Sequence, residues 1–242
     1  MKVVISLTSV PPRFKYLPAV IERLEHQMCH EIWLNIPRSY KRFPDWDGSF
    51  DFQFSSKIVV NRDCEDLGPG TKMFGPLKFL EPDDIIVYLD DDTNYDPKLV
   101  TNLMKWWRTD QNAAWGLSGF NFENYFKGQY PREHGASVDV LEGYGAVVLR
   151  CALLKQLEAE FKEMTEITWH DDMILCNLLE KHGNPRKTIC TPMCNVGQIQ
   201  QFNFGFEEDA LHHVAGGSHT ANNKKILEQF ELKNKNYYKY RP

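Results

Sequence analysis

Three consecutive aspartates, Asp90, Asp91 and Asp92, directly follow the apolar residues 85–89, which are rich in β-branched side chains. Such a run predicts a buried strand. If the extended geometry continues, Asp90 and Asp92 point to the same face, because side chains alternate along a strand. Paired carboxylates supply oxygen ligands that suit Mg²⁺ or Mn²⁺, and α/β sheets bind ligands at the carboxyl ends of their strands. The pattern therefore favours a metal site over the alternative, a solvated acidic turn before a helix.

Small polar and cationic residues follow two other apolar runs. They are Thr8, Ser9 and Arg13 after the run at 3–7, and Asp63 and Lys72 on either side of the Gly68-Pro69-Gly70 turn after the run at 57–62. Together with a metal they offer backbone donors and positive charge, which a nucleoside diphosphate requires. A metal neutralises the diphosphate and stabilises it as a leaving group, and Lys72 could add a point charge. Ordinary surface positions for Arg13 and Lys72 are the alternative for each residue taken alone.

A second acidic pair, Asp171 and Asp172, opens a helix predicted at 171–181. Either residue could be the general base that takes a proton from an acceptor hydroxyl. The alternative is structural, because an aspartate at a helix N-terminus caps free N–H groups and favours the helix dipole. We expect one cap and one functional acid, and we prefer Asp172 as the base.

The elements that must position these residues alternate in type along the first part of the chain. Helical spacing and short apolar runs predict strands at 3–7, 31–36, 57–62 and 85–89 and helices at 18–28 and 71–80. This alternation predicts an α/β fold with a mixed, mostly parallel sheet flanked by helices. The later part predicts helices at 97–107, 152–161 and 171–181, strands at 113–120, within 138–150 and at 188–191, and an irregular tail with a helix at 222–230.

Length and composition narrow the class of protein. The 242 residues suit a single domain, which we divide into a nucleotide-binding half at 1–110 and an acceptor-binding half at 111–242. The 28 basic and 33 acidic residues give a net charge of −5, which argues against general nucleic-acid binding. The six cysteines are scattered without a CxxC pair, which is typical of free thiols in a reducing cytosol. No apolar run suits a signal peptide or a membrane span, so we expect a cytoplasmic protein without a membrane span.

The spacings of two common nucleotide-binding motifs are absent from the sequence. The Gly68-Pro69-Gly70 turn lacks the spacing of a Walker loop, and no GxGxxG follows the first predicted strand. P-loop NTPases and the usual dinucleotide-binding folds are therefore disfavoured.

Three segments of the sequence resemble those of the GT-A glycosyltransferases, which carry a DxD motif. They are Ile5-Ser-Leu-Thr-Ser-Val-Pro-Pro-Arg-Phe14, Asp66-Leu-Gly-Pro-Gly-Thr-Lys72 and Tyr88-Leu-Asp-Asp-Asp92. The first two are similar to a subgroup of bacterial and large-virus sugar transferases, and closest to the N-terminal rhamnosyltransferase-like domain of a chlorovirus glycan-building protein. The resemblance spans most of the chain and is strongest before Arg150.

The resemblance implies roles for the residues named above. It implies that Thr8, Ser9 and Arg13 hold the nucleobase and ribose, and that Asp63 and Lys72 lie beside the uracil or diphosphate. Asp90 would contact the ribose or the waters of the metal, and Asp92 would bind the metal directly. Asp91 would have a less central place. The resemblance also puts Gly143, within Glu142-Gly-Tyr-Gly145, under the transferred sugar and acceptor. A tight turn between strands is the alternative for that segment.

His213-x-x-Gly216 resembles the C-terminal signature of glycogenin-like retaining transferases, in which a histidine completes the metal site. Imidazole suits Mn²⁺ beside carboxylates. The Lys-Pro-Trp continuation of that signature is missing here, so His212 and His219 are rivals, and polar histidines of an ordinary tail are the alternative.

We therefore expect a glycosyltransferase that depends on Mn²⁺ or Mg²⁺ and moves a sugar from a UDP-sugar to a glycan or other hydroxyl acceptor. Inversion would require a base such as Asp172, whereas retention would not, and the histidine signature favours retention. A sugar nucleotidyltransferase is one alternative, although the glycine-rich loop usual after its first strand is missing. A carbohydrate-binding module with a relic site is the other.

Overall fold

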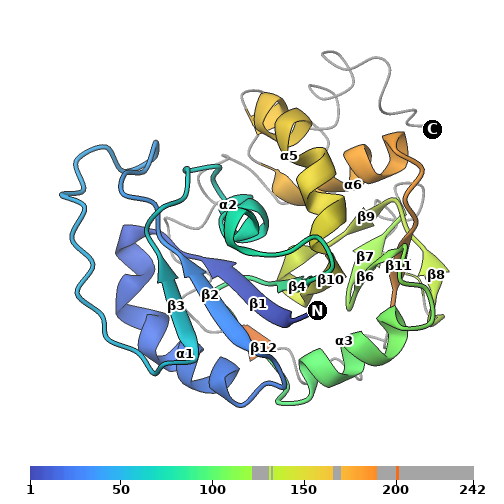
Figure 1. The fold of residues 1–242 in the computed structure, drawn as a ribbon, viewed down its shortest axis with the longest axis horizontal. Coiled ribbons are helices and arrows are strands. Elements are labelled where there is room, and N and C mark those ends of the chain that lie inside the picture. Colours follow the sequence, from blue (N-terminus) through green and yellow to red (C-terminus); the bar gives the residue numbers. More distant parts are fainter. Residues whose placement is uncertain (122–130, 132, 166–169, 190–199, 202–242) are drawn as a thin grey trace.

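The computed structural model describes residues 1–121, 131, 133–165, 170–189 and 200–201 (Figure 1). Within these residues the central element is an eight-stranded sheet in the order β3-β2-β1-β4-β10-β6-β11-β8. Its strands are β1 (Val3–Thr8), β2 (Glu31–Asn35), β3 (Ile58–Asn61), β4 (Ile85–Tyr88), β6 (Ala114–Gly116), β8 (Ala136–Ser137), β10 (Val147–Arg150) and β11 (Arg186–Thr188). The first four pair in parallel, as do β6 and β11, whereas β10 runs antiparallel to β4 and β6, and β8 antiparallel to β11. The prediction of a mixed, mostly parallel sheet is confirmed.

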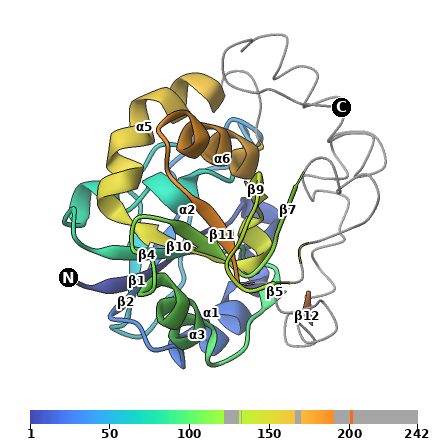
Figure 2. The same ribbon diagram turned by 90° about the vertical axis from the view of Figure 1, so that its right-hand side faces the viewer.

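Helices cover both faces of this sheet, as Figure 1 and the turned view in Figure 2 show. One face carries α1 (Leu17–Glu25) and α3 (Leu99–Trp107), and the other carries α2 (Thr71–Phe74), α5 (Cys151–Thr165) and α6 (Asp171–Lys181). Successive side chains of β1 point to opposite faces of the sheet. Ile5 packs with the layer of α1 and α3, and Val4 packs with the layer of α2, α5 and α6. Because both faces are covered, β4 is buried at every position, as is usual for parallel strands. Among the residues that the structure describes, no helix is long and apolar enough to cross a membrane.

The predicted strand at 113–120 is divided between two sheets. Its first part is β6, and its second part, β7 (Gly119–Phe120), pairs with β9 (Val140–Leu141). The segment 138–150 likewise holds β9, the 3-10 helix η3 (Gly143–Gly145) and β10. A further small sheet joins β5 (Thr93–Asn94) to β12 (Gln200–Gln201). The predicted helix at 222–230 lies outside the described residues.

The helix predicted at 71–80 breaks at Gly75 and Pro76. It forms α2 and then a 3-10 turn, η2 (Leu77–Phe79), because Pro76 has no N–H to continue the helical ladder. Gly75 also lies so close to the sheet that a Cβ there would be 2.6 Å from Asn35 Oδ1. The break therefore lets α2 sit directly on β1 and β2, and this brings Lys72 to the carboxyl ends of the strands.

Candidate functional site

The acidic cluster, which we define as Asp90, Asp91 and Asp92, lies just past the carboxyl end of β4. The strand ends at Tyr88, and Asp91 and Asp92 form a turn before β5. The extended geometry therefore stops before the aspartates, and the alternation expected of a longer strand does not orient them. Instead, the three carboxylates are divided between two cations, one from α2 and one from the segment after β1.

Lys72 is a buried cation that joins the acidic cluster to α6. Its Nζ lies 2.6 Å from Asp90 Oδ1 and 2.8 Å from Asp171 Oδ2, and its side chain is 3% exposed. Burial lowers the pKa of Lys72, but Asp171 and then Asp90 outweigh this and hold the pKa well above its ordinary value. The ammonium group is therefore charged, and the surface position considered for Lys72 is wrong.

Arg13 reaches the acidic cluster from the 3-10 helix η1 (Pro11–Tyr16). Its Nη2 atom lies 2.9 Å from Asp91 Oδ1 and 3.0 Å from Asp92 Oδ2. Burial lowers the pKa of Arg13, but Asp91 and Asp92 more than restore it. Burial raises the pKa of Asp91 to about 6, although Arg13 opposes that shift. Arg13 is thus the counter-ion of two of the three aspartates, and the surface position considered for it is also wrong.

Aromatic packing holds η1 in place. The ring of Phe14 lies 5.6 Å from that of Trp46 and 4.9 Å from that of Phe50, both edge-on, and 6.4 Å from Tyr40. Edge-to-face contacts of this kind add to the stabilisation from burial. Because Phe14 is the residue after Arg13, this anchor directs the guanidinium towards the acidic cluster.

Asp171 and Asp172 occupy the first turn of α6, but neither is the cap that we expected. The N-cap residue is His170, and its side chain makes no capping bond. Asp171 pairs with Lys72, and Asp172 Oδ2 accepts a hydrogen bond of 2.9 Å from the Gly143 N–H. Asp172 Oδ1 is shielded from solvent and has no hydrogen-bond partner among the described residues. Burial, and then the charge of Asp171, raise the pKa of Asp172 well above its ordinary value.

The close approach of α2, η3 and α6 requires glycine at position 143. A Cβ there would lie 2.9 Å from both Lys72 Nζ and Asp172 Oδ1. Gly143 is therefore packed against the two charged side chains, and the tight turn considered for this segment is present. The turn ends at Ala146 with φ 67° and ψ 140°, a conformation that costs a residue other than glycine on the order of 1–3 kcal/mol.

Glu142 is a buried carboxyl group that the sequence does not single out. Its Oε2 accepts a hydrogen bond of 2.5 Å from Ser118 Oγ, which lies 3.1 Å from the Tyr144 hydroxyl. Burial raises the pKa of Glu142 to about 7. Tyr95 connects this group to the acidic cluster, because its hydroxyl accepts from the Asp90 N–H at 3.0 Å and donates to the Tyr144 carbonyl at 2.9 Å. The only sign of this buried carboxyl group in the sequence is that Glu142 follows two apolar residues and precedes a glycine.

A ladder of buried polar side chains fixes α2 on the sheet. Ser6 Oγ donates to the carbonyl of Lys72 at 2.5 Å, and Asn35 Nδ2 donates to Ser6 Oγ at 2.9 Å. Asn61 Nδ2 donates to Asn35 Oδ1 and to the carbonyl of Gly75, both at 2.9 Å. These bonds hold the backbone on both sides of the α2 turn, so they position Lys72. Polar residues within or at the end of apolar strands were the signal that could have revealed the ladder.

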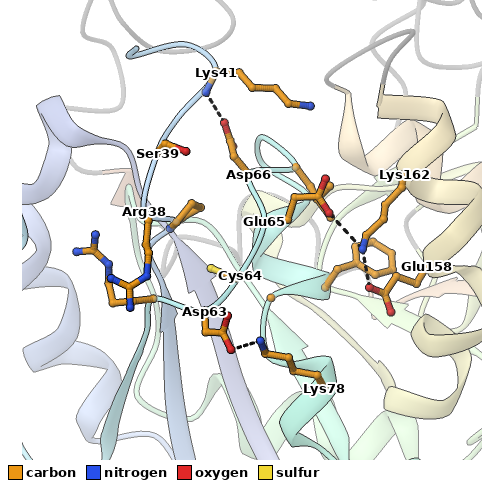
Figure 3. Close-up of a pocket in the computed structure, with 15 residues that line it drawn as sticks. Arg38, Ser39, Lys41, Asp63, Cys64, Glu65, Asp66, Lys78, Glu158 and Lys162 are labelled. Atoms are coloured by element: carbon orange, nitrogen blue, oxygen red, sulfur yellow. Dashed lines mark hydrogen bonds and ion pairs between the residues drawn. The ribbon is translucent and has the colours of Figure 1, made fainter. Parts of the chain in front are cut away.

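A pocket of about 490 Å³ lies where the loops after β2 and β3 face α2 and α5 (Figure 3). Asp63 lines this pocket and pairs with Lys78, as Figure 3 shows. Lys162 crosses the opposite side, 3.2 Å from Glu65 and 3.1 Å from Glu158. The described residues that line the pocket include none of the acidic cluster. The structure therefore does not bring Asp63 together with Asp90 or Asp92.

Ser9 lies beside the acidic cluster, since its hydroxyl opposes the rise in the pKa of Asp91, whereas Thr8 contacts the neighbouring strand. Thr8 Oγ1 donates to the carbonyl of Asn35 at 2.7 Å, and the carbonyl of Ser9 accepts from the Tyr40 hydroxyl at 2.8 Å. His213 and its rivals His212 and His219 lie outside the described residues. The predicted site residues that the structure does bring together are Ser9, Arg13, Lys72, Asp90, Asp91, Asp92, Gly143, Asp171 and Asp172.

The donor atoms at the end of β4 fit a divalent cation by their chemistry. The side chains of Asp90 and Asp92 are 34% and 18% exposed, and carboxylate oxygens are the ligands that Mg²⁺ and Mn²⁺ prefer. Among the described residues, however, no three His, Cys, Asp or Glu side chains are arranged to hold a metal ion. A metal at Asp90 and Asp92 would thus take further ligands from water, from a substrate or from residues outside the described ranges, where the predicted ligand His213 lies.

Comparisons with known proteins show similarity of fold. No protein-family model and no curated protein matches the sequence. Mannosyltransferase PcManGT from Pyrobaculum calidifontis, solved in complex with GDP-Man and Mn²⁺, matches with a TM-score of 0.62 and 13% identity over 100% of this chain and 66% of that one. Residues 1–349 of S. aureus TarS match with a TM-score of 0.53 and 12% identity over 98% of this chain and 74% of that one. A cytidylyltransferase from Francisella tularensis, with a TM-score of 0.49, is too dissimilar to carry an argument.

At 12–13% identity these matches establish the fold alone. The expected GT-A fold, a mixed sheet flanked by helices, is confirmed. The chain spans slightly less than two thirds of the PcManGT structure, at 66%, so the activity of that protein is not carried over.

Replacing Lys72 by methionine should destabilise the protein strongly, because Asp90 and Asp171 would lose the buried cation that compensates them. We expect the free energy of unfolding to fall by about 3–5 kcal/mol, the usual cost of breaking a buried ion pair from one side. Urea denaturation measures the change. Lys78→Met is the matched control, since Lys78 is 49% exposed and a surface pair contributes about 0–1 kcal/mol. A loss below about 1 kcal/mol for Lys72→Met would contradict the assignment of Lys72 as a compensating cation.

Glu142→Gln should change how stability depends on pH. The pKa of Glu142 is about 7 in the folded state against an ordinary 4.5, so the folded protein retains a proton that the unfolded chain has released. The free energy of unfolding should therefore fall as pH rises from about 4.5 to about 7, by on the order of 3 kcal/mol. Glutamine does not titrate, so the variant should match wild type near pH 4 and exceed it by that amount at pH 8. Urea denaturation across this range tests the expectation, and a difference that does not vary with pH would refute it.

Proposed function

We propose that this chain is a metal-dependent glycosyltransferase that moves a sugar from a nucleoside-diphosphate sugar to a hydroxyl group of a glycan or other acceptor. The observation that supports this most is the convergence of five carboxyl groups and two cations at the carboxyl end of β4 in a GT-A fold. In α/β sheets, ligands bind at such strand ends. The choice of a UDP-sugar, and the narrower resemblance to bacterial and large-virus sugar transferases, rest on the sequence segments.

On the donor side, Asp90 and Asp92 would hold Mn²⁺ or Mg²⁺. When bound, the metal would neutralise the diphosphate and make it a better leaving group. Lys72 fixes Asp90 and keeps its orientation, since the two side chains form an ion pair of 2.6 Å. Asp63 would contact the nucleoside end of the donor in the pocket of about 490 Å³, a volume within the usual range for small-molecule sites. Thr8 and Ser9, after β1, would lie beside the nucleobase and ribose.

On the acceptor side, Asp172 would be the general base. Gly143 holds one of its carboxylate oxygens, and the other, Oδ1, is shielded from solvent without a described partner, so it would accept the proton once an acceptor hydroxyl is packed against it. A pKa raised by burial gives the carboxylate a high proton affinity, which a base acting near neutral pH requires. Asp171 would act through Lys72, with which it pairs. A base in this position supports inversion of the transferred sugar, whereas the histidine signature that favours retention lies outside the described residues.

Neither alternative has an observation in its favour. A sugar nucleotidyltransferase would need a glycine-rich loop after β1, whereas this chain has two prolines there, at the start of η1. A non-catalytic carbohydrate-binding module would have no reason to keep Lys72 buried and charged between two carboxylates. Incubation with UDP-sugars and Mn²⁺, with and without added pyrophosphate, separates the three, because only the transferase releases UDP and only the nucleotidyltransferase consumes pyrophosphate to give UTP and a sugar 1-phosphate.

Asp92→Asn should remove the metal dependence of donor binding. In wild type we expect Mn²⁺ to tighten UDP binding, and in the variant we expect at least about a tenfold loss of that affinity, or about 1.4 kcal/mol. Calorimetric titration with UDP, with Mn²⁺ and with EDTA, measures both. Asp51→Asn is the control, since it changes the net charge equally at an exposed position. Equal UDP affinity of wild type and Asp92→Asn in Mn²⁺ would count against the metal assignment.

Asp172→Asn should lower turnover while leaving donor binding nearly intact. Loss of a general base costs roughly 10²–10⁴-fold in rate, and asparagine keeps the acceptor oxygen for the Gly143 N–H. Steady-state UDP release with a sugar donor gives the rate, and calorimetry with UDP and Mn²⁺ gives the affinity. Turnover equal to that of wild type would exclude Asp172 from the chemistry, and a parallel loss of affinity would indicate a structural role instead.

A further inference from the structure

We propose that Arg13 is an exchangeable counter-ion of the acidic cluster, which a divalent cation displaces from Asp92 and which then binds the diphosphate of the donor. Lys72, in contrast, is a permanent counter-ion. The inference rests on the proposed metal-dependent function, and it assigns Arg13 a role at the phosphates in place of the expected one at the nucleobase.

The position of Arg13 Nη2 is the first observation. This single nitrogen lies 2.9 Å from Asp91 Oδ1 and 3.0 Å from Asp92 Oδ2, so it bridges the carboxylates of two successive residues. A divalent cation held by Asp92 would take its place among the same oxygens, because Mg²⁺ and Mn²⁺ are bound by carboxylates. Two cations that share one carboxylate repel each other strongly in a partly buried site. Arg13 and the metal therefore exclude each other at Asp92.

The difference between the two internal cations is the second observation. Lys72 is 3% exposed, it lies between Asp90 and Asp171, and Ser6 holds its backbone carbonyl. Its ammonium cannot withdraw without leaving the buried Asp171 and the partly exposed Asp90 uncompensated. The Arg13 side chain is 12% exposed, against 3% for Lys72, and its partner Asp92 is 18% exposed, so part of this ion pair faces solvent although the Nη2 atom itself is shielded. The long arginine side chain can move away there while Phe14 keeps its backbone in place.

Charge balance gives the displaced guanidinium a new partner. A nucleoside diphosphate enters with negative charge directly beside the metal, and arginine binds phosphate oxygens with two parallel hydrogen bonds. Arg13 would thus exchange a carboxylate for a phosphate, so its charge stays compensated in both states. Without nucleotide the guanidinium returns to Asp92 and opposes metal binding. The metal and the donor should therefore bind cooperatively, and Arg13 should set the size of that cooperativity.

Mn²⁺ binding without nucleotide tests this directly. Electron paramagnetic resonance of free Mn²⁺ gives the affinity of wild type, Arg13→Gln, Arg13→Lys and the control Arg108→Gln, which removes the same charge from an exposed position at the end of α3. We expect Arg13→Gln to bind Mn²⁺ at least about tenfold more tightly than wild type and Arg108→Gln to match wild type. Adding UDP should then raise the Mn²⁺ affinity of wild type more than that of Arg13→Gln.

An unchanged or weaker Mn²⁺ affinity of Arg13→Gln, with a wild-type circular dichroism spectrum, would overturn the inference. If Arg13→Gln does not fold, Arg13→Lys decides, because lysine lacks the planar fork and should hold Asp91 and Asp92 less well, which gives about threefold tighter Mn²⁺ binding. Equal affinity of Arg13→Lys and wild type would then refute the inference.

The inference and the proposed function can fail separately. Tighter Mn²⁺ binding by Arg13→Gln in a protein that releases no UDP from any sugar donor would support the inference and refute the function. Metal-dependent UDP release with no effect of Arg13→Gln on Mn²⁺ affinity would do the opposite. Absence of Mn²⁺ binding in every variant would overturn both.

Discussion

Compensation of charge at the carboxyl end of β4 is the constraint on which the rest of the site depends. Asp90, Asp91 and Asp92 follow a fully buried strand, and Asp171 and Asp172 approach them from α6. Carboxylates gathered in this way repel one another unless cations lie between them. Lys72 and Arg13 fill that need, and several other features follow from it: the ladder that pins α2, the glycine at 143, and the aromatic anchor of η1.

The sequence predicts the sheet well because apolar runs between turn residues are local signals. The strands at 3–7, 31–36 and 57–62 and the parallel start of the sheet all follow from such runs. It predicts the members of the site less well, since burial is a property of the packed molecule. Nothing local shows that the chain turns after Tyr88, or that Asp171 binds Lys72 and Asp172 binds Gly143 rather than capping α6. Glu142 was missed for the same reason.

The pocket at Asp63 and the acidic cluster are separate regions that one rigid element connects. Asn61 Oδ1 accepts from the Asp63 N–H at 3.0 Å, and Asn61 Nδ2 holds the carbonyl of Gly75, which also lines the pocket. At the other end of the ladder, Ser6 holds the carbonyl of Lys72. The Ser6, Asn35 and Asn61 side chains of this ladder are buried and hydrogen-bonded, so displacing one leaves another unsatisfied. The spacing between the pocket and the cluster is thus fixed by the sheet itself, which suits a ligand with two ends of constant separation.

The place of β10 in the sheet has a consequence for the nascent chain during its synthesis on the ribosome. β10 lies between β4 and β6, yet the chain makes it after α3, β6 and β9. Until residues 147–150 leave the exit tunnel, one edge of β4 has no partner, and that strand is apolar on both faces. An unpaired apolar edge is a template for association with other nascent chains. The nascent chain therefore exposes one edge of its central strand until β10 has been synthesised.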